Sequence, residues 1–223
     1  MGKLDLLRDY NATAHLYDER YKEEQMPKIS FLLGKLRPKE KDLLLDVGCG
    51  TGLLFEKVNC KLIVGVDISL NMLREAKKRA TGVTNVYSGG AKAAEARAET
   101  EVERDAERGA EVGAKALGGE SLESQQKLVG RIKDNVELIL ADAEFLPIRS
   151  GSVDIVVSVT ALQLTEDQEK AISEIMRVLK DQGSFGISII KKASVPNGLP
   201  KGTEIYDLDE MRDVFCVFKK EGF

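Results

Sequence analysis

The stretch Leu43–Gly52, "LLLDVGCGTG", decides the fold, because an apolar run ends in an acid and passes directly into a glycine-rich turn. Residues 43–47 have the composition of a buried parallel strand, which is apolar on both faces. Glycines at positions 48, 50 and 52 let the backbone turn tightly and let a ligand approach the main chain. A helix that begins after such a turn presents free N–H groups to that ligand. The stretch therefore predicts a strand, a ligand-binding turn and a helix, in that order.

The spacing of the turn and the acids around it narrow the class of ligand. A dinucleotide-binding turn reads G-x-G-x-x-G, whereas this one reads G-x-G-x-G. Asp46 stands just before the first glycine, where a carboxylate repels a pyrophosphate and attracts an amino group. Asp67 ends the run "KLIVGVD", where a carboxylate can accept from both hydroxyls of a ribose, and Asp142, in "ADAEFLP", can accept from an adenine amino group. These acids predict a cationic adenosine without phosphates, such as S-adenosylmethionine.

The rest of the chain repeats the order of strand and helix, which predicts a mostly parallel sheet covered by helices on both faces. Ser69 is expected to cap one helix and Gly183 to end another. No strand is expected after residue 190. Further strands are expected at 61–67, 135–143, 152–162 and 184–190, and helices before residue 40, after residue 53, and at 69–80, 169–183 and 207–223.

One segment, residues 88–133, interrupts this order within what is otherwise a single domain spanning 1–223. Its composition shifts to Ala, Glu, Arg and Gly, it has few large apolar residues, and Gly-Gly pairs flank it. Because Ala and charged residues favour helix, we expect a helical insertion without a core of its own. A solvated excursion, a lid or partner-binding element, and a non-native insertion all stay open. "TNVY" before it resembles "DNVE" after it.

Composition and charge exclude several classes of protein. The formal net charge is -4, which argues against binding nucleic acid by bulk charge. Cys49, Cys60 and Cys216 are scattered and form no CxxC pair, so neither a disulfide framework nor a metal site is expected, and a cytoplasmic location fits best. No apolar run approaches the length of a membrane span.

Five motifs in order resemble those of class I S-adenosylmethionine-dependent methyltransferases: "LLLDVGCGTG", "VGVDIS", "ADAEFLP", "GSVDIVVSVTALQL" and "EIMRVLKDQGSFGIS". The resemblance covers about residues 10–190. It implies a Rossmann-like three-layer α/β/α sandwich, S-adenosylmethionine as cofactor and methyl transfer as activity. It also implies the cofactor-binding residues: Gly48, Cys49, Gly50 and Gly52 along the methionine portion, Asp46 at its amino group, Asp67 at the ribose, Ile68, Met72, Asp142 and Ala143 at the adenine, Ser158 at the methionine end, and Tyr17 and Tyr21 in a segment that closes over it.

The chain departs from this family's pattern at its C-terminus. The family's sheet ends in an antiparallel hairpin, whereas no strand is expected here after residue 190, so the hairpin is predicted to be absent. The fifth strand would then be an uncovered edge that a protein partner or a second copy of the chain could pair with. The insertion is the other site where such a partner is expected.

The sequence identifies neither the methyl acceptor nor a catalytic residue. The Asn/Asp-Pro-Pro-aromatic motif of nucleobase N-methylation is absent after the fourth strand, and "SVTALQL" stands there instead. This resembles enzymes of quinone biosynthesis and the wobble-uridine tRNA methyltransferases, so a small molecule and a tRNA base both stay open. Gln163, His15, Lys191, Lys192 and Lys201 are candidate functional residues, each with a structural or solvated interpretation beside it. The alternative to an enzyme is a cofactor-binding assembly or regulatory protein without catalysis.

Overall fold

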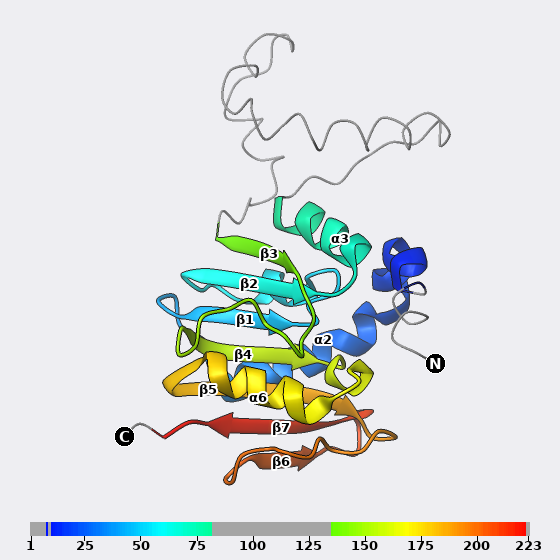
Figure 1. The fold of residues 1–223 in the computed structure, drawn as a ribbon. Helices are drawn as coiled ribbons and strands as arrows, with labels where there is room; N and C mark the ends of the chain where they lie inside the picture. Colours follow the sequence, from blue (N-terminus) through cyan, green and yellow to red (C-terminus); the bar gives the residue numbers. More distant parts are fainter. Residues whose placement is uncertain (1–7, 9, 82–134, 222–223) are drawn as a thin grey trace, which may run out of the picture. The chain divides into compact units, whose positions relative to one another are not determined.

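The computed structural model describes residues 8, 10–81 and 135–221, which form a seven-stranded sheet with helices on both faces (Figure 1). The strand order is β3-β2-β1-β4-β5-β7-β6, and all neighbours from β3 to β5 are parallel. This confirms the mostly parallel, Rossmann-like sandwich, while the expected helical insertion at 88–133 lies outside the described residues. The strands are β1 Leu43–Val47, β2 Leu62–Asp67, β3 Val136–Leu140, β4 Val153–Val159, β5 Leu179–Ile190, β6 Glu204–Asp207 and β7 Asp213–Lys219.

Helices cover the sheet on both sides. Helix α6 packs on one face, whereas α2, η2 and α3 pack on the other. Leu44 of the central strand enters the cluster beside α2, and the next residue, Leu45, enters the cluster beside α6. Both are fully buried because successive side chains of a strand point to opposite faces. The helices are α2 Tyr17–Leu36, α3 Leu70–Thr81 and α6 Gln168–Val178, with short 3-10 turns at η1 Ala14–Leu16, η2 Leu53–Lys57 and η3 Leu162–Leu164.

The predicted absence of the C-terminal hairpin is wrong. β7 pairs antiparallel with β5, placing Cys216 opposite Ile187, and β6 pairs antiparallel with β7. The expectation of a helix over 207–223 is therefore wrong, because residues 213–219 of this range form β7. The run "DVFCVFK" is rich in β-branched and aromatic residues, which favour strands. Phe215 and Cys216 are both fully buried, so the strand lacks the alternation of apolar and polar residues that distinguishes a strand from a helix.

The completed sheet also changes where a partner is expected. β5 is an internal strand, and within the described residues the sheet edges are β3 and β6. The expectation of a partner at an uncovered β5 is thus wrong, and a partner at the insertion stays a prediction. In the same described part of the chain, no helix combines the length and apolar character that crossing a bilayer requires.

Two local expectations differ from the structure and one is confirmed. α6 ends at Val178 and β5 begins at the next residue, so Gly183 lies within a strand. Glycine is needed there because a Cβ would lie 2.9 Å from the Lys180 carbonyl oxygen. The glycine-rich turn leads into the short η2 rather than into an α-helix. The cap of α3 is confirmed, since Ser69 Oγ accepts a hydrogen bond from Met72 N at 3.2 Å.

Candidate functional site

The carboxyl ends of β1, β2, β3 and β4 surround a cavity of about 110 Å³. It lies where the strand order reverses, because the chain builds outward from β1 to β2 and β3 and then returns to β4 on the other side of β1. Ligands of open α/β sheets bind in such a crevice. The structure brings together here most of the predicted site residues, namely Tyr17, Gly48, Gly50, Asp67, Ile68, Met72, Asp142 and Ala143.

The glycine-rich turn needs its first and last glycines for different reasons. Gly48 and Gly52 have φ values of +73° and +77°, a conformation that L side chains rarely adopt. A Cβ on Gly48 would lie 2.3 Å from the Cβ of Ala161, so this turn packs directly against the segment after β4. A Cβ on Gly52 would lie 2.5 Å from the ring of Phe55. Gly52 lines neither of the cavities described here and supports the turn from within the core.

Asp67 organises the turn as well as facing the cavity. Its Oδ2 accepts from Gly50 N and its Oδ1 from Ser69 N, both at 2.8 Å. Burial raises the pKa of Asp67, while these backbone hydrogen bonds oppose the shift. An ionised carboxylate has about four lone-pair positions, so these backbone bonds leave part of its accepting capacity for other donors.

The end of the cavity beside β2 and β3 combines apolar faces with a polar rim. Met72, on the first turn of α3, is buried, and Ile68 is 38% exposed at the mouth. Asp142 and Ala143 follow β3, where the Asp142 carbonyl accepts from Phe145 N at 3.0 Å and closes a turn. The arrangement suits a flat aromatic ring that presents an amino group at its edge.

A second cavity, of about 40 Å³, lies beside the first and shares Tyr17, Gly48 and Gly50 with it. Asp46 and Cys49, which the resemblance placed along the methionine portion, line this smaller cavity. Burial, and then the nearby charge of Asp67, raise the pKa of Asp46 to about 8, so its carboxyl group is mostly protonated at neutral pH. Burial likewise raises the pKa of the Cys49 thiol, which leaves it unreactive.

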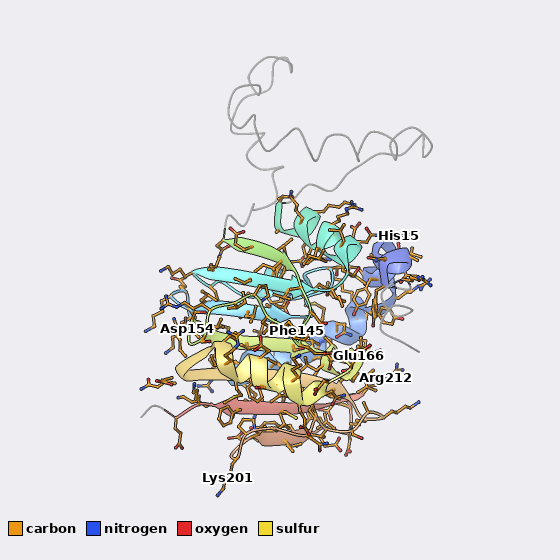
Figure 2. The ribbon with its side chains drawn as sticks, viewed as in Figure 1. His15, Phe145, Asp154, Glu166, Lys201 and Arg212 are labelled. Atoms are coloured by element: carbon orange, nitrogen blue, oxygen red, sulfur yellow. The ribbon has the colours of Figure 1, made fainter. Side chains whose placement is uncertain are left out.

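Residues 10–21, which include the first turn of α2, cover the cavity. Tyr10 and Tyr17 line it, and burial raises the pKa of both phenols, so both stay neutral. Tyr21 does not line it. Tyr21 is 42% exposed and instead packs against Tyr17, with ring centroids 4.9 Å apart. His15 is exposed and lies at the outer surface of this segment (Figure 2).

The side chains of Asn11 and Asp18 fasten this cover to the domain. Asn11 Oδ1 accepts from Ser69 Oγ at 2.7 Å. Asp18 Oδ1 accepts from Thr51 Oγ1 at 2.6 Å, and its other oxygen pairs with Arg79. The cover is therefore attached next to the glycine-rich turn and next to the start of α3, the elements that form the cavity.

The segment after β4 forms the opposite wall, and one predicted residue of β4 is absent from it. Ser158 is fully buried and its Oγ donates to the Val47 carbonyl at 2.8 Å, which ties β4 to β1. Gln163 does not line the cavity either, because its Nε2 donates to the Thr160 carbonyl at 2.8 Å. Residues that sequence reasoning missed make up much of the wall: Val159, Thr160, Ala161, Leu162, Leu164 and Thr165, with Tyr10 from the cover.

Apart from the three acids and the two half-buried tyrosines, the described lining offers little acid–base chemistry. Histidine, lysine and arginine are missing from the residues described around either cavity. The described residues also contain no cluster of side chains suited to a metal ion. The lining combines acceptor carboxylates with apolar faces, a combination that suits an adenosine-like molecule with an amino tail.

Comparison with known families and proteins agrees with this geometry. Two family models, each described as a methyltransferase domain, match residues 44–105 and 100–187. An uncharacterized protein of Methanocaldococcus jannaschii is 26% identical over 99% of this chain and 77% of its own length. A malonyl-[acyl-carrier protein] O-methyltransferase of a Marinomonas species is 24% identical over 87% of this chain. The chain spans only about half of that second relative, 54% of its length.

Solved structures show the same fold. A putative S-adenosyl-L-methionine-dependent methyltransferase from Methanococcus maripaludis has a TM-score of 0.62 and 14% identity, covering 97% of this chain and 94% of its own. A putative methyltransferase solved in complex with the Haloferax volcanii Trm112 activator has a TM-score of 0.54 and 19% identity, over 82% of this chain and 60% of that one. The sheet order, the glycine-rich turn and the two domain matches together place this chain among the class I S-adenosylmethionine-dependent methyltransferases.

Proposed function

We propose that this domain binds S-adenosylmethionine in the cavity at the carboxyl ends of β1–β4 and transfers its methyl group to a small-molecule acceptor. The observation that carries the proposal is the placement of Asp67 and Asp142 beside the glycine-rich turn, around a cavity at the reversal of strand order. Carboxylates there select an adenosine, and the absence of a phosphate-binding spacing selects a ligand without phosphates.

The lining supports one orientation of the cofactor. The adenine would lie between Ile68 and Met72, with its edge at Asp142 and Ala143. The ribose hydroxyls would donate to the lone pairs of Asp67 that the backbone leaves available. The methionine portion would then follow Gly48 and Gly50 toward the smaller cavity, where Asp46 would meet its amino group.

In this orientation, Gly52, Ser158 and Tyr21 take supporting roles without contacting the cofactor. Gly52 packs on Phe55, Ser158 ties β4 to β1, and Tyr21 packs on Tyr17. Cys49 stays a backbone neighbour of the methionine portion rather than a reactive group.

The chain's own residues would act by alignment rather than by proton transfer. The cofactor supplies an activated methyl group, so the protein must mainly hold an acceptor in line with it. Tyr10 and Tyr17, as neutral, half-buried phenols, would shield the site from water. Since the described lining holds no histidine or lysine, the acceptor that fits best is one that is already ionised or readily ionised, such as a carboxylate, a phenol or an acidic carbon.

Charge pairing favours a small acceptor over a tRNA base. Lys191 pairs with Asp207 at 2.6 Å, and Arg212 pairs with Glu24 at 3.2 Å, so cations close to the end of β5 are partly neutralised. Lys201 lies beside β6, at the far edge of the sheet from the adenine end of the cavity (Figure 2). Binding RNA normally requires several unpaired cations around the site.

The name of the Marinomonas relative suggests one reaction to include among the tests. That protein is called a malonyl-[acyl-carrier protein] O-methyltransferase. O-methylation of a carboxylate needs no base from the protein, which agrees with the described lining. Carboxylic acids, free and carrier-bound, therefore belong in the acceptor screen.

The test has a binding stage and a turnover stage. Calorimetric titration should show micromolar binding of S-adenosylmethionine and S-adenosylhomocysteine and none of NADH. Production of S-adenosylhomocysteine is then measured with pools of small carboxylic acids and phenols, with acyl-carrier thioesters, and with bulk tRNA. Turnover on tRNA alone would contradict the small-molecule proposal. Binding without turnover on any pool would favour a non-catalytic assembly protein.

A further inference from the structure

A buried ion pair stands behind the β4 wall of the cavity. Lys28, on α2, and Asp213, at the start of β7, approach to 2.9 Å, and their side chains are only 1% and 0% exposed. Lys28 Nζ also donates to Glu24 Oε1 at 2.8 Å. Burying two charges is costly, and well-packed apolar side chains often stabilise a fold as well or better. The pair therefore requires an explanation other than stability alone.

Thr160 connects this pair to the cavity. Its Oγ1 donates to Asp213 Oδ2 at 2.7 Å and accepts from Lys28 Nζ at 3.1 Å. Ser188, on β5, donates to the same Asp213 oxygen at 2.8 Å, and its own Oγ accepts from Thr160 N at 3.0 Å. Three elements that are distant in sequence, α2, β5 and β7, thus converge on one residue that lines the cavity.

The contacts from α2, β5 and β7 hold the backbone of Thr160 in an unusual conformation. Its φ is +54°, a left-handed conformation that is strained for a β-branched residue and persists only where the surroundings enforce it. The left-handed turn directs the next residue, Ala161, back toward the glycine-rich turn. At that point the Cβ of Ala161 packs so closely on Gly48 that a Cβ added to Gly48 would be only 2.3 Å from it.

We propose that Lys28 and Asp213 are positioning residues that hold Thr160 in its left-handed turn and so keep the wall after β4 against the glycine-rich turn. Neither residue lines the cavity, so both act through Thr160. The inference rests on the proposed function, because that proposal places the methionine portion of the cofactor between this wall and the glycine-rich turn. The network lies away from Asp67 and Asp142, so it fixes the methyl-donating end of the cavity and leaves the adenosine end unaffected.

The test compares two ligands that differ only at the end in question. S-adenosylhomocysteine fills both ends of the cavity, whereas adenosine fills only one. We expect Thr160→Val, which keeps the branched shape but removes the hydroxyl, to weaken S-adenosylhomocysteine binding tenfold or more and to change adenosine binding less than twofold. Thr160→Ser, which restores the hydroxyl, should restore the affinity. Asp213→Asn, which removes the charge at constant size, should resemble Thr160→Val.

A matched control separates positioning from general loss of stability. Ile172→Val removes one methylene from a fully buried residue of α6 that lines neither cavity. It should lower the melting temperature and leave both affinities unchanged. If Thr160→Val weakens both ligands equally, or if affinity follows the melting temperature across all variants, the proposal is overturned. If Asp213→Asn does not fold, the two Thr160 variants still decide, because they leave both charges paired. Wild-type protein that binds neither ligand would overturn the proposed function itself, and this inference with it.

Discussion

The two ends of the cavity are built by different means. At the adenosine end, Asp67 accepts from the backbone of Ser69 and Gly50, which are 2 and 17 residues away in the sequence. At the β4 end, Thr160 is held by Lys28 and Asp213, which are 132 and 53 residues away. The first end is encoded by short motifs, whereas the second exists only when the whole sheet has assembled. Damage to one end should therefore leave ligand contacts at the other largely intact.

The largest effect is expected from Asp67→Ala. Loss of two charge-assisted hydrogen bonds to the ribose should weaken S-adenosylmethionine binding by on the order of 30- to 1,000-fold, or about 2–4 kcal/mol. Adenosine should lose affinity by a similar factor, because the ribose is common to both ligands. Calorimetric titration of the two ligands measures this, and unchanged affinity would show that the ribose lies elsewhere.

Asp154→Ala is the matched control for this variant. Asp154 Oδ2 accepts from Leu43 N at 2.9 Å and pairs with Lys180 at 2.8 Å, so it also holds backbone with a carboxylate. It lies at the start of β4, at the amino ends of the parallel strands, whereas the cavity lies at their carboxyl ends (Figure 2). Its loss should lower the melting temperature without changing ligand affinity. Equal loss of binding in both variants would mean that Asp67 acts through the stability of the sheet.

The adenosine end of the cavity could be predicted from the sequence, whereas the β4 end could not. The glycine-rich turn, Asp67 and Asp142 were predictable because each lies within a few residues of a strand end that its own apolar run marks, whereas Met72 followed only from the family resemblance. Thr160 was not predictable, since no local pattern signals a left-handed β-branched residue. Its conformation depends on partners contributed by α2, β5 and β7.

The errors in the expected fold have a related cause. β7 is buried on both faces, so its residues carry no alternation that distinguishes strand from helix, and its assignment depends on pairing with β5. Ser158 was expected at the cofactor because of its place near the end of β4. Its hydroxyl instead donates to the Val47 carbonyl, a contact that only the pairing of β4 with β1 reveals.

A smaller, pH-dependent effect is expected from Asp46. Burial, and then Asp67, raise its pKa to about 8, so at lower pH it must release a proton to meet a cationic amino group. Affinity for S-adenosylhomocysteine should therefore rise between pH 6 and pH 8, by at most tenfold per pH unit. Asp46→Asn should flatten this profile. 5′-Methylthioadenosine, which lacks the amino acid tail, should show no such profile with either protein, and a slope with that ligand would contradict the assignment.

The same carboxyl group should affect folding stability in the opposite direction. Its pKa in the folded protein lies above the value of 3.8 for an unperturbed group, so its stabilising contribution is complete below about pH 4 and is lost as the pH rises toward 8. Asp46→Asn removes this dependence. The melting temperature of the variant should therefore exceed that of the wild type by more at pH 8 than at pH 6, with both proteins free of ligand.

The smallest effect is expected from the cover, which shares one anchor with the adenosine end. Asn11 Oδ1 accepts from Ser69 Oγ, and Ser69 N in turn donates to Asp67. In Asn11→Ala the cover should open more often, because the variant also loses the longer hydrogen bond from Asn71 N to Asn11 Oδ1 at 3.3 Å. Dissociation of S-adenosylhomocysteine should accelerate roughly threefold to tenfold, since the short hydrogen bond from Ser69 Oγ contributes about 0.5–1.5 kcal/mol and the longer one adds little. Stopped-flow displacement of the bound ligand measures the rate.

The control for the cover is a second asparagine that makes a side-chain hydrogen bond to a different element. Asn59 Nδ2 donates to Glu40 Oε1 at 2.9 Å, close to the start of β2 and away from the cavity. Asn59→Ala should leave the dissociation rate unchanged. If Asn11→Ala weakens binding by slowing association while dissociation stays constant, the segment forms part of the binding surface rather than a cover. The comparison of the two ends would then have to include residues 10–21 as a third component of the adenosine site.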